Sequence, residues 1–203
     1  LQRLLTQAAR MILRQLERRP FKSLLSSFGI ALAVAVLVLG SFMEDALDYL
    51  IEFQFYISQR QDMSVTFVET GTGGVLHEVE HLPGVINAEP FRSVAVRLRH
   101  GYRSRRLGIM AIGSDADLYR LVDKHEETVV IPPFGIVISE KLAELLDVGL
   151  GDTLTVEVQE GERPVRNVVV SGLVADYSGT NAYMNADVLH RLMREGNSIN
   201  GAF

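Results

Sequence analysis

A stretch of 21 consecutive uncharged residues, 23–43, constrains this chain more than any other part of its sequence. At about 1.5 Å of rise per residue, a helix of this length extends roughly 31 Å, which matches the hydrocarbon core of a bilayer. A secretory signal peptide has a shorter apolar segment, followed by small residues at a cleavage site, and residues 40–43 offer no such site. The stretch predicts a membrane-spanning helix over residues 20–43, in preference to an uncleaved signal-like segment or a buried core helix.

Charges on either side of the stretch predict its orientation. Acidic residues follow it, and basic residues, which stay on the cytoplasmic side, precede it. Residues 44–203 are therefore expected outside the cytoplasm, with the chain held in the cell (inner) membrane and its N-terminus in the cytoplasm. Residues 1–22 carry a net charge of +5, which leaves −10 on the rest of a chain whose net charge is −5. An acidic outer region excludes general electrostatic binding of nucleic acid. The basic residues expected at the membrane surface are Arg10, Arg14, Arg18, Arg19 and Lys22.

The residues next to the span are expected to be helical as well. Residues 1–19 alternate apolar side chains and arginines at helical spacing, which predicts an amphipathic helix on the cytoplasmic side. That helix lies flat on membrane lipid or packs on another part of the protein, and the sequence leaves both open. Pro20 ends this pattern and suits the first turn of the next helix. Residues 44–61, both acidic and aromatic, predict a stalk helix.

Small residues within the span form one stripe. Gly29, Ala33 and Gly40 lie along one side of the predicted helix, where small side chains let another helix approach closely. Glycine and alanine are also common in membrane helices in general. The stripe is therefore explained equally well by a packing partner and by the usual composition of a membrane helix.

Residues 62–203 change to short strands and short helices, which predicts an α+β extracytoplasmic domain of mixed strands, hairpins and helices. The region has enough chain to bury a core, as one domain or as two lobes. The chain has no cysteine, which excludes disulfides and thiolate metal sites. Strands are predicted at 63–68, 94–98, 107–111, 136–138, 153–158 and 165–174, and helices at 75–82, 115–123, 140–146 and from 185 or 186 to 194. Residues 196–201 read as a turn.

One pattern suggests metal chemistry. His77, Glu78 and His81 match the H-E-x-x-H arrangement of zinc hydrolases, in which two imidazoles one helical turn apart hold the metal. Asn87 occupies the place of a third histidine, and Pro83 ends the helix at once. A solvated polar helix face is the favoured interpretation, and the three residues stay a weak metal candidate.

No other pattern indicates catalysis, and we expect neither catalytic nor cofactor-binding residues. The glycine-rich turn at residues 71–74 lacks both the third glycine of a dinucleotide fingerprint and the G-K-[ST] of a P-loop. The chain is therefore not expected to be an enzyme. One basic hairpin could meet an acidic partner or anionic lipid, or could be an ordinary charged face that discourages strand pairing. Its residues are Arg97, Arg99, Arg103, Arg105 and Arg106.

Three stretches resemble the permease subunits of ABC exporters of the FtsX/MacB-like family. They are RRPFKSLLSSFGIAL at 18–32, LPGVINAEP at 82–90, and a closing part made of ISEKLA at 138–143, VGLGDTL at 148–154, VSGLV at 170–174 and AYM at 182–184. The resemblance implies a periplasmic core-like domain, three further membrane helices beyond this fragment, a separate ATPase subunit and a second permease copy or homologue. Relatives of this kind export lipids, lipoproteins or drugs, or signal across the membrane.

Two hypotheses follow from these observations. The first is a fragment of an exporter permease that couples ATP hydrolysis by a partner to movement of the outer domain. The alternative is a single-pass, membrane-anchored binding or sensor module, and an anchored zinc hydrolase is a distant third.

Overall fold

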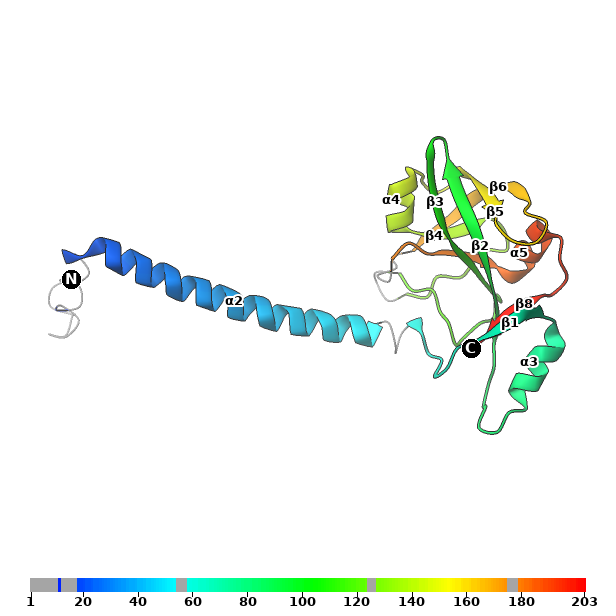
Figure 1. Ribbon diagram of the computed structural model, residues 1–203, viewed down its shortest axis with the longest axis horizontal. Helices are drawn as coiled ribbons and strands as arrows, with labels where there is room; N and C mark the ends of the chain where they lie inside the picture. Colours follow the sequence, from blue (N-terminus) through cyan, green and yellow to red (C-terminus); the bar gives the residue numbers. More distant parts are fainter. Residues whose placement is uncertain (1–10, 12–17, 54–57, 124–126, 175–178) are drawn as a thin grey trace. The chain divides into compact units, whose positions relative to one another are not determined.

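The computed structural model describes residues 11, 18–53, 58–123, 127–174 and 179–203 of the chain (Figure 1). They belong to two compact units, Leu1–Leu50 and Ile51–Phe203, each of which is described by itself. Most of the amphipathic helix predicted for residues 1–19 lies outside the described residues.

Helix α2 (Pro20–Glu52) is one continuous helix of 33 residues. It begins at the proline, as expected, and it crosses the predicted boundary between span and stalk at residue 43 without a break. Helix α2 ends at Glu52, within the predicted stalk, and Gln59 forms an antiparallel β-bridge with Tyr119. Residues 54–57 lie outside the described part of the chain.

Six strands of the second unit close into a barrel. Neighbours around the ring are β2 and β3, β3 and β7, β7 and β4, β4 and β6, β6 and β5, and finally β5 and β2. The pairs β3–β7 and β4–β6 are parallel, and the others are antiparallel. The strands are β2 (Pro90–His100), β3 (Arg103–Ile112), β4 (Ile136–Ser139), β5 (Thr153–Val158), β6 (Val165–Val174) and β7 (Ala182–Asn185).

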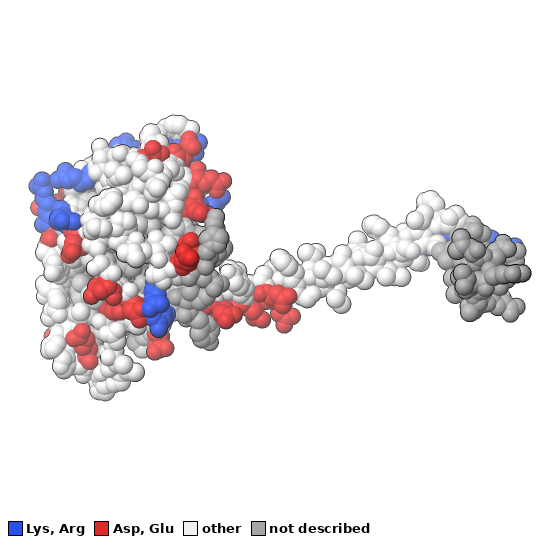
Figure 2. Space-filling view, turned by 180° about the vertical axis from the view of Figure 1, so that it is seen from behind, with Lys and Arg blue, Asp and Glu red and all other residues white. Residues whose placement is uncertain are grey.

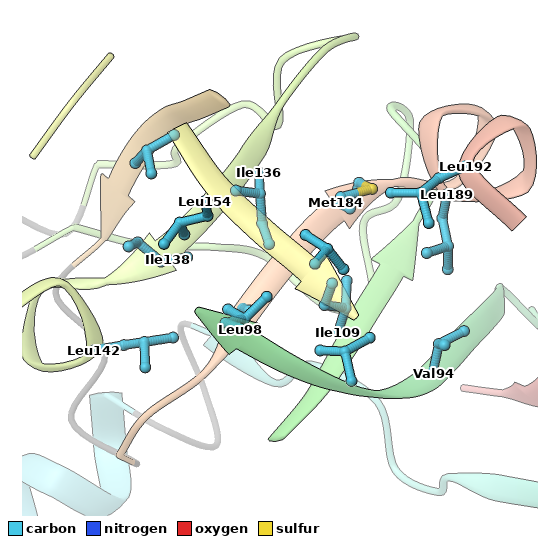
Figure 3. Packing of buried hydrophobic residues seen from close by; sticks show 14 of the residues in the cluster. Val94, Leu98, Ile109, Ile136, Ile138, Leu142, Leu154, Met184, Leu189 and Leu192 are labelled. Atoms are coloured by element: carbon cyan, nitrogen blue, oxygen red, sulfur yellow. The ribbon is translucent and has the colours of Figure 1, made fainter. Parts of the chain in front are cut away.

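Alternate residues of these strands fill the barrel with aliphatic side chains. Val94, Val96 and Leu98 of β2 are fully buried, and the intervening side chains point outward, as the two-residue period of a strand requires. Helices α4 (Glu140–Leu146) and α5 (Ala186–Met193) complete this core. Figure 3 shows Leu142 of α4 on one side of the interior and Leu189 and Leu192 of α5 on the other. One closed barrel therefore forms the main core of the unit.

Local sequence signals place both helices. Ser139 Oγ accepts a hydrogen bond from Leu142 N, and Asn185 Oδ1 accepts one from Asp187 N, so each helix has a side-chain N-cap. Each ends at a residue in the left-handed conformation, Asp147 for α4 and Arg194 for α5. The predictions for these two helices are confirmed.

A small sheet extends from one end of the barrel. The first residues of β2 pair with β8 (Ile199–Ala202), and β8 pairs with β1 (Val65–Gly71). Helix α3 (Gly73–Glu80) follows β1 (Figure 1). The turn predicted at residues 196–201 is wrong beyond residue 198, because β8 begins there. A Cβ at Gly201 would clash with the ring of Phe91, so glycine serves here to let β8 approach β2.

The buried guanidinium group of Arg92 in β2 forms ion pairs with two other parts of the domain. Its side chain, only 5% exposed, donates to Glu160 Oε1 at 2.6 Å, in the turn between β5 and β6, and to Glu195 Oε1 at 3.1 Å, just after α5. Such a pair gives little net stability but makes loss of either partner costly, because a buried charge is left unmatched.

The segment from Ile112 to β4 differs most from expectation. The helix predicted at residues 115–123 does not form; the chain is extended there and makes bridges from Tyr119 to Gln59 and from Val122 to Thr128. Tyr119 and Leu121 pack with Tyr183 in a second apolar cluster. Burial of these alternate side chains against the barrel outweighs the local helical preference.

Replacing Leu98 with alanine tests the barrel. Leu98→Ala is expected to lower the free energy of unfolding by roughly 2–5 kcal/mol, because it leaves a cavity in a fully buried layer. Leu150→Ala is the control: this leucine is 68% exposed, and its loss is expected to change stability by less than about 0.5 kcal/mol. Denaturant unfolding followed by circular dichroism measures both, and equal effects would contradict the assigned core.

Candidate membrane span and helix-exit anchor

Helix α2 has the length and composition of a membrane span. It is the one helix in the described part of the chain that is long and apolar enough, and none of its side chains is buried. Figure 2 shows its central part without charged side chains and acidic groups toward the end that carries residues 44–52. Of the predicted basic surface residues, Arg18, Arg19 and Lys22 are exposed, whereas Arg10 and Arg14 lie outside the described ranges.

The small-residue stripe leaves space beside this helix. A Cβ placed at Gly29 or at Gly40 would meet no other atom within 4 Å. Ser41 Oγ donates to the carbonyls of Leu37 and Val38, so the hydroxyl is satisfied within its own helix. Packing of another helix on Gly29, Ala33 and Gly40 stays a prediction.

The basic hairpin β2–β3 is partly neutralised within the domain. Arg97 and Arg99 both face Glu157 of β5, at 3.5 and 3.2 Å. Arg103 lies 3.5 Å from Asp147 and also donates to Tyr102, and that hydrogen bond is the main reason the pKa of Arg103 is raised. Arg105 and Arg106 are exposed and form no ion pair with the described acidic side chains.

The histidine pair adopts a compact arrangement at the end of α3. His81 is the C-cap of the helix, its Nδ1 lies 2.7 Å from the carbonyl oxygen of His77, and the two rings make an edge contact. His77 also lies 3.5 Å from Glu80. Within the described ranges no group of three or more His, Cys, Asp or Glu side chains could hold a metal ion. The weak candidate of His77, Glu78 and His81 therefore finds no further ligand there.

Residues 58–61, here called the exit segment, are bonded to the domain by their backbone. Arg60 N donates to Leu118 O at 2.9 Å, and Arg120 N donates to Ser58 O at 2.9 Å. Ser58 Oγ adds a bond to Arg120 O. Because four residues, 54–57, separate this segment from Phe53, the chain is fixed to the domain soon after α2 ends.

Asp117 adds a charged contact between the exit segment and the domain; we call this point of attachment the joint. Its carboxylate accepts a hydrogen bond from Arg60 at 2.8 Å and pairs with Arg120. The hydrogen bond from Arg120 is the main cause that lowers the pKa of Asp117, and the positive charges of Arg120 and Arg60 lower it further. Removing the carboxylate would leave two cations side by side.

Glu89 connects this joint to the small sheet. Its carboxylate accepts the backbone N–H groups of Asp117 and Leu118, at 2.9–3.0 Å. Its own backbone exchanges two hydrogen bonds with Phe203, and β2 begins at the next residue. We call the exit segment, residues 117–120 and Glu89 together the exit anchor.

Sequence reasoning missed the exit anchor. Three of its charged residues, Arg60, Glu89 and Asp117, are far apart in the chain. The end of the predicted stalk and the helix predicted at 115–123 include Gln59 and Tyr119, which form a β-bridge instead. The one available signal is the proline after Glu89, which marks an extended segment there.

Comparison with known proteins finds one matching family and two similar solved structures. The family described as "MacB-like periplasmic core domain" matches residues 23–201. Two solved structures are similar, each with a TM-score of 0.47. The extracellular domain of the noncanonic ABC-type transporter YknZ from Gram-positive bacteria is 15% identical, with 68% of this chain and 79% of that chain covered. The periplasmic region of MacB from Actinobacillus actinomycetemcomitans is 17% identical, with 66% and 64% covered. No curated protein matches the chain.

The ion pairs of Asp117 predict a pH effect of definite sign. Its pKa is lower in the folded than in the unfolded state, so its stabilisation is complete above the unfolded value of about 3.9 and is lost as the pH falls through the folded value. Asp117→Asn is therefore expected to lower the melting temperature at neutral pH, and the difference from wild type is expected to shrink toward about pH 3.

Thermal unfolding followed by circular dichroism measures this effect. Asp62→Asn, which changes an exposed aspartate just after the exit segment, is the matched control and is expected to follow the wild type at every pH. A loss in Asp117→Asn that stays constant as the pH falls would contradict the electrostatic role.

Proposed function

Because the chain belongs to the MacB-like periplasmic core domain family of ABC-type transporter permeases, we propose that it is the part of an exporter permease that links a membrane helix to a moving outer domain. Movement of α2, driven by ATP hydrolysis in a separate ATPase subunit, is passed to residues 51–203. Lipids, lipoproteins or drug-like molecules are the proposed cargo, and signalling across the membrane is the other use of the same movement.

The observation that carries this proposal is the bonded exit segment. Two backbone hydrogen bonds and the Arg60–Asp117 ion pair fix residues 58–61 to the chain around residue 118. A flexible tether would let helix and domain move independently. A fixed joint this close to the end of α2 instead favours transmission of force to the domain.

The expected orientation is part of the proposal. Basic residues before the span and acidic residues after it favour a cytoplasmic N-terminus and an extracytoplasmic domain. The family description as a periplasmic domain agrees with a segment outside the cytoplasm.

We infer that ATP hydrolysis takes place in a partner. The chain has no G-K-[ST] after a glycine-rich loop, which is the sequence that binds nucleotide phosphates in ABC-type ATPases. The proposed partners are this ATPase, a second permease copy or homologue, and membrane lipid. The stripe of Gly29, Ala33 and Gly40 is the proposed contact between membrane helices.

A membrane-anchored binding or sensor module is the second candidate. A candidate span joined to a folded domain, as in the described part of the chain, is the arrangement that such a module needs. The two candidates differ in one property, because only the permease is expected to purify with an ABC-type ATPase.

Single cysteines test the orientation, since the chain has none of its own. Cysteine at Asp115 is expected to react with a membrane-impermeant thiol reagent in intact cells. Cysteine at Arg18 is expected to react only after permeabilisation. Labelling of the Arg18 site alone from outside would reverse the proposed orientation.

A second experiment tests coupling in the full-length protein purified with its ATPase and placed in lipid nanodiscs. An environment-sensitive dye on a cysteine at Val130, which is 72% exposed, is expected to change its fluorescence when ATP is added. The double variant Arg60→Ala/Asp117→Ala is expected to reduce this change by roughly twofold or more, because the joint loses its ion pair.

Asp62→Ala is the control for that experiment and is expected to keep the full ATP response. If the full-length protein purifies without an ATPase, the sensor module would be favoured. A complex whose fluorescence responds to ATP equally in the double variant and the wild type would show that the exit anchor does not carry the coupling.

A further inference from the structure

A cleft of about 480 Å³ lies on the outer face of the barrel, beside the exit anchor. Ser93, Gly108 and Met110 line it from β2 and β3, whereas Val94 and Ile109, the alternate residues, are fully buried inside the barrel. Its volume falls within the range of roughly 300–1,000 Å³ that is usual for small-molecule sites. The cleft is therefore large enough for a ligand and is separate from the barrel core.

The polar side chains that line the cleft are neutral in the described part of the chain. They comprise three carboxamides, two serine hydroxyls and the hydroxyls of Tyr119 and Tyr183, and no charged side chain of the described residues lines it. A charged ligand would lose its hydration there without gaining an opposite charge, which is unfavourable. Carboxamides offer both donors and acceptors, so the lining suits a ligand with several hydroxyl or amide groups. The carboxamides and serines are Gln59, Gln61, Ser64, Ser93 and Asn181.

Aromatic rings form the other part of the lining. Phe203 stacks on Tyr119 with ring centroids 5.3 Å apart, and the hydroxyls of Tyr119 and Tyr183 lie 3.0 Å from each other. These contacts hold the rings in place without a ligand. Flat apolar rings beside neutral amides match a molecule that has one apolar face and polar groups at its edge.

Gln61 supplies a separate indication of a ligand. Its side-chain Oε1 is buried and has no hydrogen-bond partner among the described residues. A buried acceptor without a partner costs stability, and a turn of this carboxamide toward a donor on a ligand in the cleft would satisfy it. The side chain thus has a polar group that the fold itself does not use.

We propose that this cleft binds a neutral saccharide unit. The pyranose ring presents C–H groups to the aromatic rings, and its hydroxyls and any acetamide group bond to the carboxamides and serines. Because the exit segment contributes Gln59 and Gln61, a bound sugar contacts both the barrel and the joint that follows α2. Binding itself requires no ATPase and is tested without one.

Calorimetric titration of the full chain with N,N′-diacetylchitobiose tests the proposal, in a detergent without a sugar head group. Gln61→Leu is expected to weaken binding by about tenfold, and its melting temperature is expected to stay equal or rise, because an unpaired buried acceptor is removed. A merely structural glutamine would give lower stability instead.

Gly108→Val is the second variant, designed to fill the cleft. A Cβ at this position meets only Ser93 Oγ, at 3.2 Å, and a β-branched residue suits a strand, so the fold is expected to tolerate it. Ser104→Val, on the exposed part of the same strand, is the matched control and is expected to bind like wild type.

Three results would overturn the proposal. The first is that the wild type does not bind the disaccharide. The second is that the wild type and both cleft variants bind it equally. The third is that the wild type binds the cationic, deacetylated disaccharide as tightly as the neutral one, or more tightly. Binding of a neutral peptide such as acetyl-Ser-Gly-Ser-amide in place of the sugar would likewise reject a saccharide and assign the cleft to peptides.

Discussion

The pairing of β2 with β5 is the constraint on which the rest of the domain depends. It joins Val96–Arg99 to Thr155–Val158 and turns a sheet that would have two open edges into a closed ring. Closure requires that the side chains inside the ring fill it, which explains the short aliphatic residues at alternate positions of β2 and β5. Arg92 reinforces this closure, because it holds the turn after β5 and the end of α5 against β2.

Strand β2 also connects the barrel to the exit anchor, the small sheet and the cleft. Glu89, immediately before it, holds the chain around residue 118; its first residues pair with β8; and Ser93 lines the cleft. A strand held on both sides inside a closed barrel is a rigid element. In the proposed coupling, force that reaches Glu89 from the exit segment would therefore act on the whole barrel and not on a single loop.

Local signals in the sequence predict the local elements well. Strand β5 alternates exposed or half-buried residues with buried aliphatic ones, and α4 and α5 have side-chain caps, so the predicted limits of these elements agree with the structure. Barrel closure was not predicted, because nothing in the sequence of β2 distinguishes a strand with one partner from a strand with two. The helix expected at residues 115–123 fails for a related reason: the burial of Tyr119 and Leu121 against the barrel is decided by distant residues.

The exit anchor depends on hydrogen bonds between residues that are 28, 57 and 62 positions apart, and the lining of the cleft comes from residues between Gln59 and Phe203. No local motif can therefore indicate either of them. A joint of this kind transmits motion only if it keeps one bonded arrangement while the parts that it connects move. Backbone hydrogen bonds meet this requirement better than ion pairs alone, since they fix the register of two extended segments and are little affected by salt. The Asp117 ion pairs then strengthen a joint whose geometry the backbone sets. A ligand in the proposed site would contact the same joint, because Gln59 belongs both to the β-bridge and to the lining of the cleft.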